Sequence, residues 1–352
     1  MPPAAEIPAL AEDARFLAPD ELGGAACIAV DGAAPANAVL AVCHWPDAGA
    51  PTWLGAPTAT AMADLYLRLG AAGRTVSAVS NNHVDEDGML AAWLLLTRPA
   101  ADAPERARAL AAAGAGDYAD WTDPWAARIA IALMALTEPA TSPIPAVRRA
   151  FTATGAKEPI GPLHRAVLPR IPRLLHDPEA FADLWRTRWS RVLADIVLLD
   201  TGVAWIEDHP ALDLAIVRAP HALDEMAVHP RVPRGRVLMW PTDAPPVLTH
   251  RYETWVAFPR ADMAPRLPLA GVAARLSALE TAPGVRWRAD EPTVPRARLR
   301  PVGRNTTPSI SELEPGDVVR ELERSRARAA EAAGNLGDVE TSPGPGRIRP
   351  GR

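Results

Sequence analysis

The sequence predicts an α/β protein in which a parallel sheet with flanking helices precedes a second, smaller α+β unit and a disordered C-terminal tail. Apolar runs at 27–30, 38–42 and 75–80 are bounded by turn residues, which is typical of short buried strands. Residues 60–69 and 89–96 carry apolar side chains at helical spacing. Because strands and helices alternate in this order, we expect a parallel sheet covered by helices.

The rest of the chain divides into a helical stretch, a second unit with strands, and a tail. From residue 104 to about 199 the pattern is mainly helical, and the clearest helices are expected at 126–136 and 179–199. Beyond about residue 301 the chain becomes rich in Pro, Gly and Arg. We expect a charged helix at 318–333 there and disorder in the last twenty residues. The second unit is expected to have strands at 203–206, 212–217, 237–240 and 254–258 and a helix at 267–280.

The length and net charge of the chain indicate how many domains to expect and which kinds of partner to exclude. A chain of 352 residues exceeds the usual size of one domain, so we expect units at 1–199 and 200–300 and a tail at 301–352. The formal net charge of −5 argues against broad binding to nucleic acids or anionic membranes. Two cysteines without CxxC spacing, no signal-peptide pattern and no apolar stretch of spanning length predict a cytoplasmic protein.

The run Asn81-Asn82-His83-Val84-Asp85-Glu86-Asp87-Gly88 carries the strongest chemical pattern. His83, Asp85 and Asp87 are two residues apart, so an extended segment leaving a strand would turn all three to one side. One imidazole and two carboxylates suit Mn²⁺, with Mg²⁺ as an alternative. Gly88 would allow a sharp turn and a close approach, and the following helix would favour an anion at its N-terminus. The other interpretation is a solvated turn in which Asp85 or Asp87 caps that helix.

The run His83-Val84-Asp85-Glu86-Asp87-Gly88 resembles the first motif of the DHH-type phosphoesterases, His-x-Asp-x-Asp-Gly, which binds manganese at a strand end. The resemblance implies an α/β domain joined to a smaller one, with a site in the cleft that hydrolyses phosphodiester or phosphoanhydride bonds. By the same resemblance, Asp117 is similar to the second-motif aspartate that bridges two metals. The chain departs from the pattern because it has no Asp-His-His triplet, and its nearest string is Asp208-His209-Pro210. His44-Trp45-Pro46 together with Asn81-Asn82-His83 also resembles an uncharacterised bacterial family.

Two further residues are candidates near the same edge of the sheet. His44 follows the predicted strand at 38–42, so it would be a fourth metal ligand or a general acid. The alternative is a strand-end histidine bonded to the backbone, with Trp45 packed beside it. Asp117 follows Gly116 in a predicted turn before Trp121, where an aspartate also needs no catalytic explanation.

Arginines are the candidates for binding substrate phosphate. Arg128, near the start of a predicted helix, would contact a phosphate or form a surface ion pair. Arg251 opens the predicted strand at 254–258 and would clamp a phosphate or join a cross-strand charge pair. A basic stretch would meet an anionic ligand or be a solvated run; it comprises Arg286, Arg288, Arg296, Arg298, Arg300 and Arg304.

These patterns together predict a metal-dependent hydrolase of a phosphate ester or phosphoanhydride, acting on a small phosphorylated or nucleotide-like substrate. The second hypothesis is a non-catalytic descendant of such enzymes that binds a nucleotide or a protein, and the missing Asp-His-His triplet favours it. Hydrolysis of a non-phosphate substrate ranks third. No Walker loop, dinucleotide fingerprint or nucleophilic Ser or Cys motif occurs in the sequence, which argues against kinases and nicotinamide enzymes.

Overall fold

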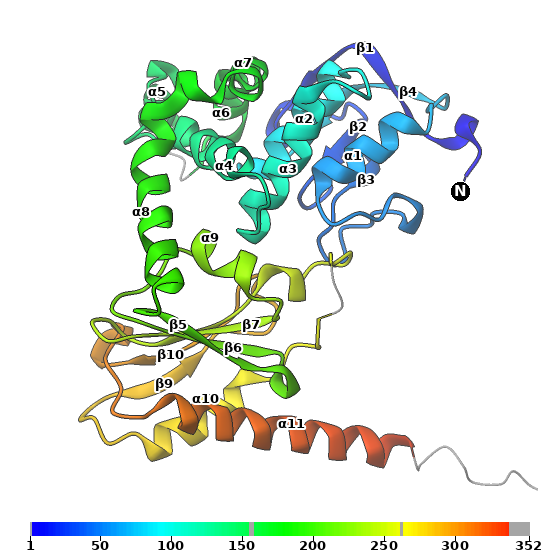
Figure 1. Ribbon diagram of the computed structural model, residues 1–352. Helices are drawn as coiled ribbons and strands as arrows, with labels where there is room; N and C mark the ends of the chain where they lie inside the picture. Colours follow the sequence, from blue (N-terminus) through cyan, green and yellow to red (C-terminus); the bar gives the residue numbers. More distant parts are fainter. Residues whose placement is uncertain (1, 155–157, 261–262, 338–352) are drawn as a thin grey trace, which may run out of the picture.

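The structure is a computed structural model that describes residues 2–154, 158–260 and 263–337. It contains two β-sheets, one in each half of the molecule, with separate hydrophobic cores (Figure 1). The mixed α/β class, the parallel first sheet and the second sheet unit confirm the prediction from the sequence. Within the part of the chain that the structure describes, no helix is long and apolar enough to cross a membrane.

The first sheet has four parallel strands in the order β1-β4-β2-β3. Strand β2 is buried at every position, as expected for an inner strand of a parallel sheet covered by helices. Because all four strands run the same way, their carboxyl ends lie along one edge, where open α/β sheets place their sites. The strands are β1 (Ala9–Phe16), β2 (Cys27–Val30), β3 (Ala38–Val42) and β4 (Thr75–Ser80).

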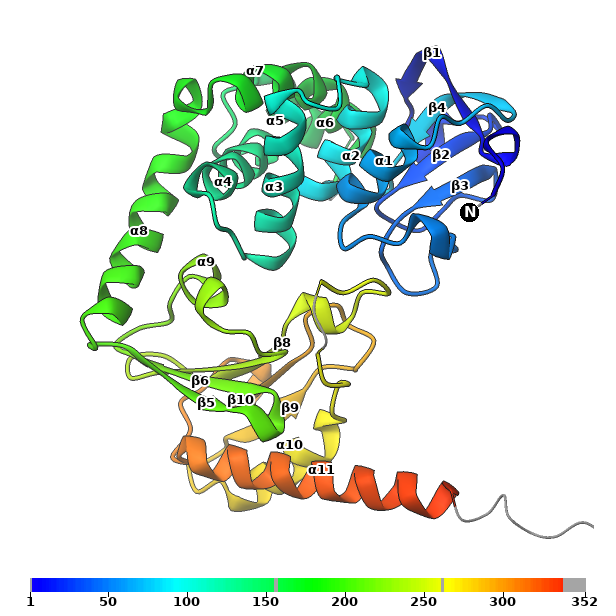
Figure 2. The ribbon, with the colours of Figure 1, turned by 45° about the vertical axis from the view of Figure 1, so that its right-hand side comes forward.

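Helices pack beside this sheet and beside one another in chain order. Helix α1 contacts α2, α2 contacts α3, and α3 contacts α4, so the helical layer grows away from the strands. The last of these helices, α8, has 19 residues and leads from the first unit to the second (Figure 2). The helices are α1 (Ala59–Arg68), α2 (Glu86–Thr97), α3 (Pro104–Tyr118), α4 (Pro124–Thr137), α5 (Pro145–Thr154), α6 (Ile160–Val167), α7 (Ile171–His176) and α8 (Ala182–Asp200).

The second sheet has six strands in the order β5-β6-β7-β8-β10-β9, and only β6 and β7 pair in parallel. Alternate residues of its strands face opposite sides. Leu238 and Leu248 pack with helices α10 and α11 in one core, whereas Val237 faces the other side. The elements are β5 (Trp205–His209), β6 (Leu214–Ala219), α9 (Glu225–Val228), β7 (Arg236–Pro241), β8 (Val247–His250), α10 (Leu269–Leu279), β9 (Arg286–Ala289), β10 (Arg298–Val302) and α11 (Pro315–Gly337).

Several predicted elements differ from the observed ones. The strand expected at 254–258 is wrong, because a short 3₁₀ turn (Tyr252–Thr254) and a loop occupy this region. The basic stretch does not lead directly into a tail: it contributes β9 and β10, where the exposed Arg286, Arg288 and Arg298 alternate with the inward-facing Trp287 and Leu299. Strand β1 was missed because seven of its eight residues are partly or fully exposed.

The tail expected at 301–352 is shorter than predicted. Residues 301–302 end β10, and α11 extends over Pro315–Gly337, where Val318 and Leu322 are fully buried in the second core. The charged helix predicted at 318–333 therefore exists and packs on the sheet unit through an apolar stripe. Of the last twenty residues expected to be disordered, 333–337 belong to α11 and 338–352 lie outside the described residues.

Candidate metal centre

Acidic and imidazole side chains gather at the carboxyl edge of the first sheet. Asp31 directly follows β2, His44 comes two residues after β3, and the segment His83 to Asp87 follows β4. Asp117 joins them from the last turn of α3. The sheet order places β2 between β4 and β3, so Asp31 lies between the two histidines.

Asp31 is the centre of this cluster. Its side chain is 1% exposed, and neither carboxylate oxygen accepts a hydrogen bond from any residue that the structure describes. Oδ1 lies 3.4 Å from Nε2 of His44, and Oδ2 lies 3.4 Å from Nε2 of His83. A buried carboxylate without donors is expensive unless a positive charge accompanies it.

Two sets of possible metal ligands share this carboxylate. Asp31, His44 and Asp87 offer ligand atoms that all lie within 4.8 Å of one another, and so do Asp31, His83 and Asp85. Oδ2 of Asp117 is 3.5 Å from Nε2 of His44, which places it beside the first set. The structure thus gives Asp31, rather than Asp117, the position between the two sets.

The ring of His44 is held so that one nitrogen faces the carboxylates. Its Nδ1 contacts the carbonyl oxygen of Pro57 and lies 3.1 Å from the Tyr118 hydroxyl. With the proton on Nδ1 and donated to that carbonyl, Nε2 presents its lone pair to the acids, as a metal-bound histidine requires. His44 is fully buried and does not line the adjoining cavity. The ligand interpretation therefore fits its position better than the general-acid one.

His83 and Asp85 form the more exposed set with Asp31. Nε2 of His83 is 2.7 Å from Oδ2 of Asp85, and the ring of Trp45 packs on the imidazole at 4.9 Å between centroids. The other oxygen of Asp85 accepts the backbone N–H of Gly88 at 2.8 Å and caps α2. The capping interpretation is therefore correct for Oδ1, while Oδ2 remains directed at the cluster.

Asp87 is fully buried and anchors the start of α1. Its oxygens accept the backbone N–H groups of Ala59 at 2.5 Å and Thr60 at 2.8 Å. Oδ2 also lies 3.9 Å from Nε2 of His44. A carboxylate oxygen has two lone pairs, so an oxygen that accepts one N–H can still bind a cation. Ligand carboxylates in metal sites are commonly held by hydrogen bonds of this kind.

Gly88 serves the site by close approach. It lies inside the first turn of α2, so the sharp turn expected at this residue does not occur. A Cβ atom there would lie 2.0 Å from Nδ2 of Asn81 and 3.2 Å from Oδ2 of Asp31. Only glycine lets the helix pack this closely against the acids.

The cluster carries more negative charge than its histidines balance. Burial, then repulsion by Asp31, raises the pKa of Asp87 to about 7. Burial and the charge of Asp87 raise the pKa of Asp117 well above its ordinary value. Burial alone would lower the histidine pKa values. The acids outweigh it, and they raise the pKa of His44 to about 9 and that of His83 to about 11. The raised pKa values of the acids and of the histidines both indicate a site that favours added positive charge.

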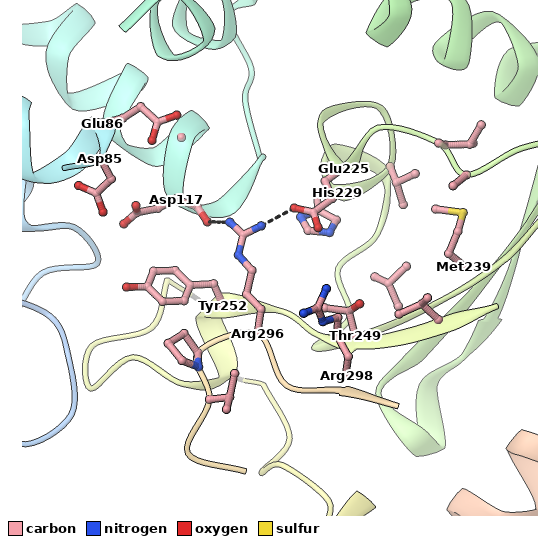
Figure 3. A pocket seen from close by; sticks show the side chains of 18 of the residues that line it. Asp85, Glu86, Asp117, Glu225, His229, Met239, Thr249, Tyr252, Arg296 and Arg298 are labelled. Carbon is pink, nitrogen blue, oxygen red and sulfur yellow. Dashed lines mark hydrogen bonds and ion pairs between the residues drawn. The ribbon is translucent and has the colours of Figure 1, made fainter. Parts of the chain in front are cut away.

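A cavity of about 780 Å³ opens beside the cluster, between the two units. Figure 3 shows Asp85, Glu86 and Asp117 on the side of the first unit, with Tyr252 and Arg296 reaching toward them from the second. Burial and the charge of Asp85 raise the pKa of Glu86 to about 7. The acids therefore form one end of a space large enough for a substrate.

Arg296 connects the two units at this end of the cavity. Its guanidinium donates to the backbone oxygen of Asp117 at 2.8 Å and to the carboxylate of Glu225 at 2.5 Å (Figure 3). The Arg296 side chain is 41% exposed, so part of it remains open to a ligand. It is the cation nearest to the acids among the arginines that line the cavity.

A family model matches residues 12–322, a range that runs from β1 into α11 and includes every residue of the cluster. The chain belongs to this family. The family is described as one of unknown function (DUF6687). Comparisons with curated proteins and with solved structures give no match. Membership in DUF6687 therefore assigns no chemistry, which has to be derived from the site itself.

In this member of DUF6687 the structure brings five predicted site residues together and separates two. His44, His83, Asp85, Asp87 and Asp117 all lie around Asp31. Arg128 lies elsewhere, with its guanidinium over the rings of Trp125, Trp185 and Trp189.

Arg251 also lies away from the acids. It is 3% exposed, paired with Glu253 and bonded to the carbonyl oxygen of Val232 at 2.5 Å. Neither Arg128 nor Arg251 lines the cavity beside the cluster. Their predicted phosphate contact has no support from this position, because packing and ion pairing already occupy both guanidinium groups.

Asp31 is the site residue that sequence reasoning missed. It follows the fully apolar run Cys27–Val30, just as His44 follows Ala38–Val42, and that position at a strand end was the available signal. The turn predicted around Asp117 is wrong: Gly114 and Gly116 lie inside α3, and Asp117 is in its last turn.

Proposed function

We propose that this protein is a metal-dependent hydrolase of a phosphate ester or phosphoanhydride, with Mn²⁺ or Mg²⁺ as its cation. The observation that carries the proposal is Asp31, a buried carboxylate whose two oxygens lack hydrogen-bond donors among the described residues and each face one set of possible ligands. The similarity of the run His83 to Gly88 to the DHH-type motif agrees with this chemistry.

The residues present fit divalent cations. Oδ1 and Oδ2 of Asp31 and Oδ2 of Asp117 are buried without hydrogen-bond partners among the described residues, as unfilled ligand positions would be. Imidazole and carboxylate donors together suit Mn²⁺, whereas Mg²⁺ prefers oxygen alone. Asp31, Asp85, Asp87 and Asp117 would carry four negative charges when ionised, which two divalent cations balance.

The cations and the side chains would have separate roles in hydrolysis. When bound, a divalent cation makes water more acidic and polarises a phosphoryl oxygen. Asp31 would hold the shared position, and Arg296 would neutralise phosphate charge from the opposite wall. As the water oxygen bonds to phosphorus, the bond to the leaving oxygen breaks and that oxygen takes up a proton. Glu86 and Tyr252 line the cavity at this end, where they can exchange a proton with substrate.

Turnover of bis(4-nitrophenyl) phosphate tests the proposal. With added Mn²⁺ the protein should release 4-nitrophenol, and EDTA should stop the reaction. Asp31→Asn should lower the rate by at least about 100-fold, because it removes the charge shared by both ligand sets. The control is Asp208→Asn, whose side chain is 51% exposed and paired with Arg234, and neither residue lines the cavity. Equal rates in wild type and Asp31→Asn would contradict the proposal.

The non-catalytic alternative has one observation in its favour. Asp87 and one oxygen of Asp85 already stabilise helix starts, so part of the cluster has a structural use without catalysis. A binding protein would retain phosphate-containing ligands in the cavity without converting them. Bound Mn²⁺ with no turnover of any phosphate ester would favour this alternative.

A further inference from the structure

The cavity wall opposite the acids is mostly apolar. It is the face of the second sheet that does not pack on α10 and α11, and it is lined by the buried Val237 and the partly exposed Met239 of β7 and by the partly exposed Val247 of β8. Leu223 and Val228 extend the same surface from the α9 region. Apolar side chains that line a cavity instead of filling it are typical of a ligand surface.

Polar groups are few on this wall. Among the described residues of β7, β8 and β10 that line it, Thr249 and Arg298 carry the polar side chains, and Arg298 already contacts Asp290 at 3.4 Å. In the α9 region, Glu225 is paired with Arg296, and Nδ1 of His229 lies 2.8 Å from the carbonyl oxygen of Tyr118. A nucleobase or sugar needs several placed donors and acceptors, because its own polar groups lose water on binding. An aliphatic group loses no hydrogen bonds when it binds here, and its transfer out of water is favourable.

The two ends of the cavity therefore differ in chemistry. Asp85, Asp117 and Arg296 form a charged end of this cavity, whose volume is about 780 Å³, and the β7–β8 face forms its apolar end. We infer that the substrate is an amphiphilic phosphate ester whose organic group is aliphatic rather than a nucleoside. This inference rests on the proposed hydrolase and specifies its substrate class. The phosphate lies at the acids and the aliphatic chain lies along Val237, Met239 and Val247.

A series of alkyl 4-nitrophenyl phosphates measures this preference. Methyl, butyl and octyl esters share one leaving group and one reacting centre, so kcat/KM reports the contribution of the chain. Each methylene that reaches the apolar wall should raise kcat/KM roughly fourfold. The thymidine 5′-(4-nitrophenyl) ester should be a poorer substrate than the octyl ester. Rates that do not rise with chain length, or a preference for thymidine, would overturn the inference.

Two variants locate the effect. Met239→Gln and Val247→Asn place amides on the wall at partly exposed positions, so the octyl-to-methyl ratio of kcat/KM should fall by about tenfold or more. Val203→Asn is the matched control, since Val203 is 51% exposed and does not line the cavity. An unchanged octyl-to-methyl ratio in both wall variants, with folding verified by circular dichroism, would show that the alkyl chain does not bind on this wall.

Direct binding separates this inference from the proposed hydrolase. Octylphosphonate resists hydrolysis, and its affinity can be measured by calorimetry with the metal-loaded and the metal-free protein. We expect Met239→Gln to weaken its binding and Val203→Asn to leave it unchanged. If no ester is turned over, the hydrolase proposal fails, while octylphosphonate binding that depends on Met239 still supports the aliphatic specificity. Equal binding of methyl- and octylphosphonate would overturn it.

Discussion

Asp117 is a residue at which the acidic cluster destabilises the fold when no cation is bound. It lies in the last turn of α3, where the helix dipole disfavours a negative charge, and its buried Oδ2 has no hydrogen-bond partner in the part of the chain that the structure describes. Burial and the charges of Asp87 and Asp31 raise its pKa well above the ordinary value. Ionising this residue therefore destabilises the metal-free fold.

Asp117→Asn should stabilise the metal-free protein. A raised folded-state pKa means that the unfolded chain releases this proton first, so the wild type loses stability as the pH rises above about 4. The gain from the amide should be absent below that pH and reach about 1–3 kcal/mol near neutrality. Urea unfolding in EDTA at several pH values measures it.

Asp117→Asn should bind metal more weakly than the wild type. With Mn²⁺ present, the wild type should therefore become the more stable of the two. Asp208→Asn, at an exposed ion pair, should change the free energy of unfolding by no more than about 0.5 kcal/mol. A variant that is less stable than wild type in EDTA at neutral pH would show that Asp117 is a structural residue.

The packing of helix α2 against the acidic cluster depends on Gly88. Alanine normally stabilises a helix relative to glycine, but at Gly88 its Cβ would meet Asn81 at 2.0 Å. Gly88→Ala should therefore lower the free energy of unfolding by about 1–3 kcal/mol and weaken Mn²⁺ binding.

Gly114 of α3 provides the matched control. A Cβ there would meet only Arg260, at the ordinary contact distance of 3.9 Å. Gly114→Ala should raise the free energy of unfolding by about 0.5–1 kcal/mol. Thermal melts of both variants test the comparison, and an equal stabilisation of both would refute the close approach of α2 to the acids.

Local sequence patterns predicted the fully buried strands and the helices that have one clear apolar face. Strands β2, β3 and β4 and helices α1 and α2 appear where the apolar runs and the helical spacing placed them. Strands β9 and β10 could not be read in this way because arginines on their outer face mask a short inward alternation. The 3₁₀ turn at Tyr252–Thr254 has apolar neighbours that resemble a strand, and tertiary packing decides between them.

The site could be predicted only in part, because its assembly is a property of the whole molecule. His83, Asp85 and Asp87 are close in sequence, so their spacing was visible. Asp31 and Asp117 join them through the strand order β1-β4-β2-β3 and the packing of α3, which no local pattern specifies. Arg251 and Arg296 were similar candidates in the sequence, and only the path of the second unit separates them.

Arg296 lines the cavity beside the acids and its ion pair is half-exposed, so its removal should affect function more than stability. Arg296→Ala should lower kcat/KM for bis(4-nitrophenyl) phosphate by about 10- to 100-fold, because it removes a charge beside the acids. Its ion pair with Glu225 is half-exposed, so the melting temperature should change little. Arg234→Ala, at the exposed pair with Asp208, is the control. An Arg296→Ala enzyme with wild-type kinetics would remove this residue from the site.

Calorimetric titration of metal-free protein with Mn²⁺ tests the central claim most directly. The cluster should bind about two equivalents, since Asp31 faces two sets of ligands and four carboxylates are available. In Asp31→Asn, both binding events should weaken by at least about 100-fold, while Asp208→Asn should bind like wild type. Wild-type protein that binds no Mn²⁺ at millimolar concentration, or Asp31→Asn protein that binds it equally well, would contradict the account.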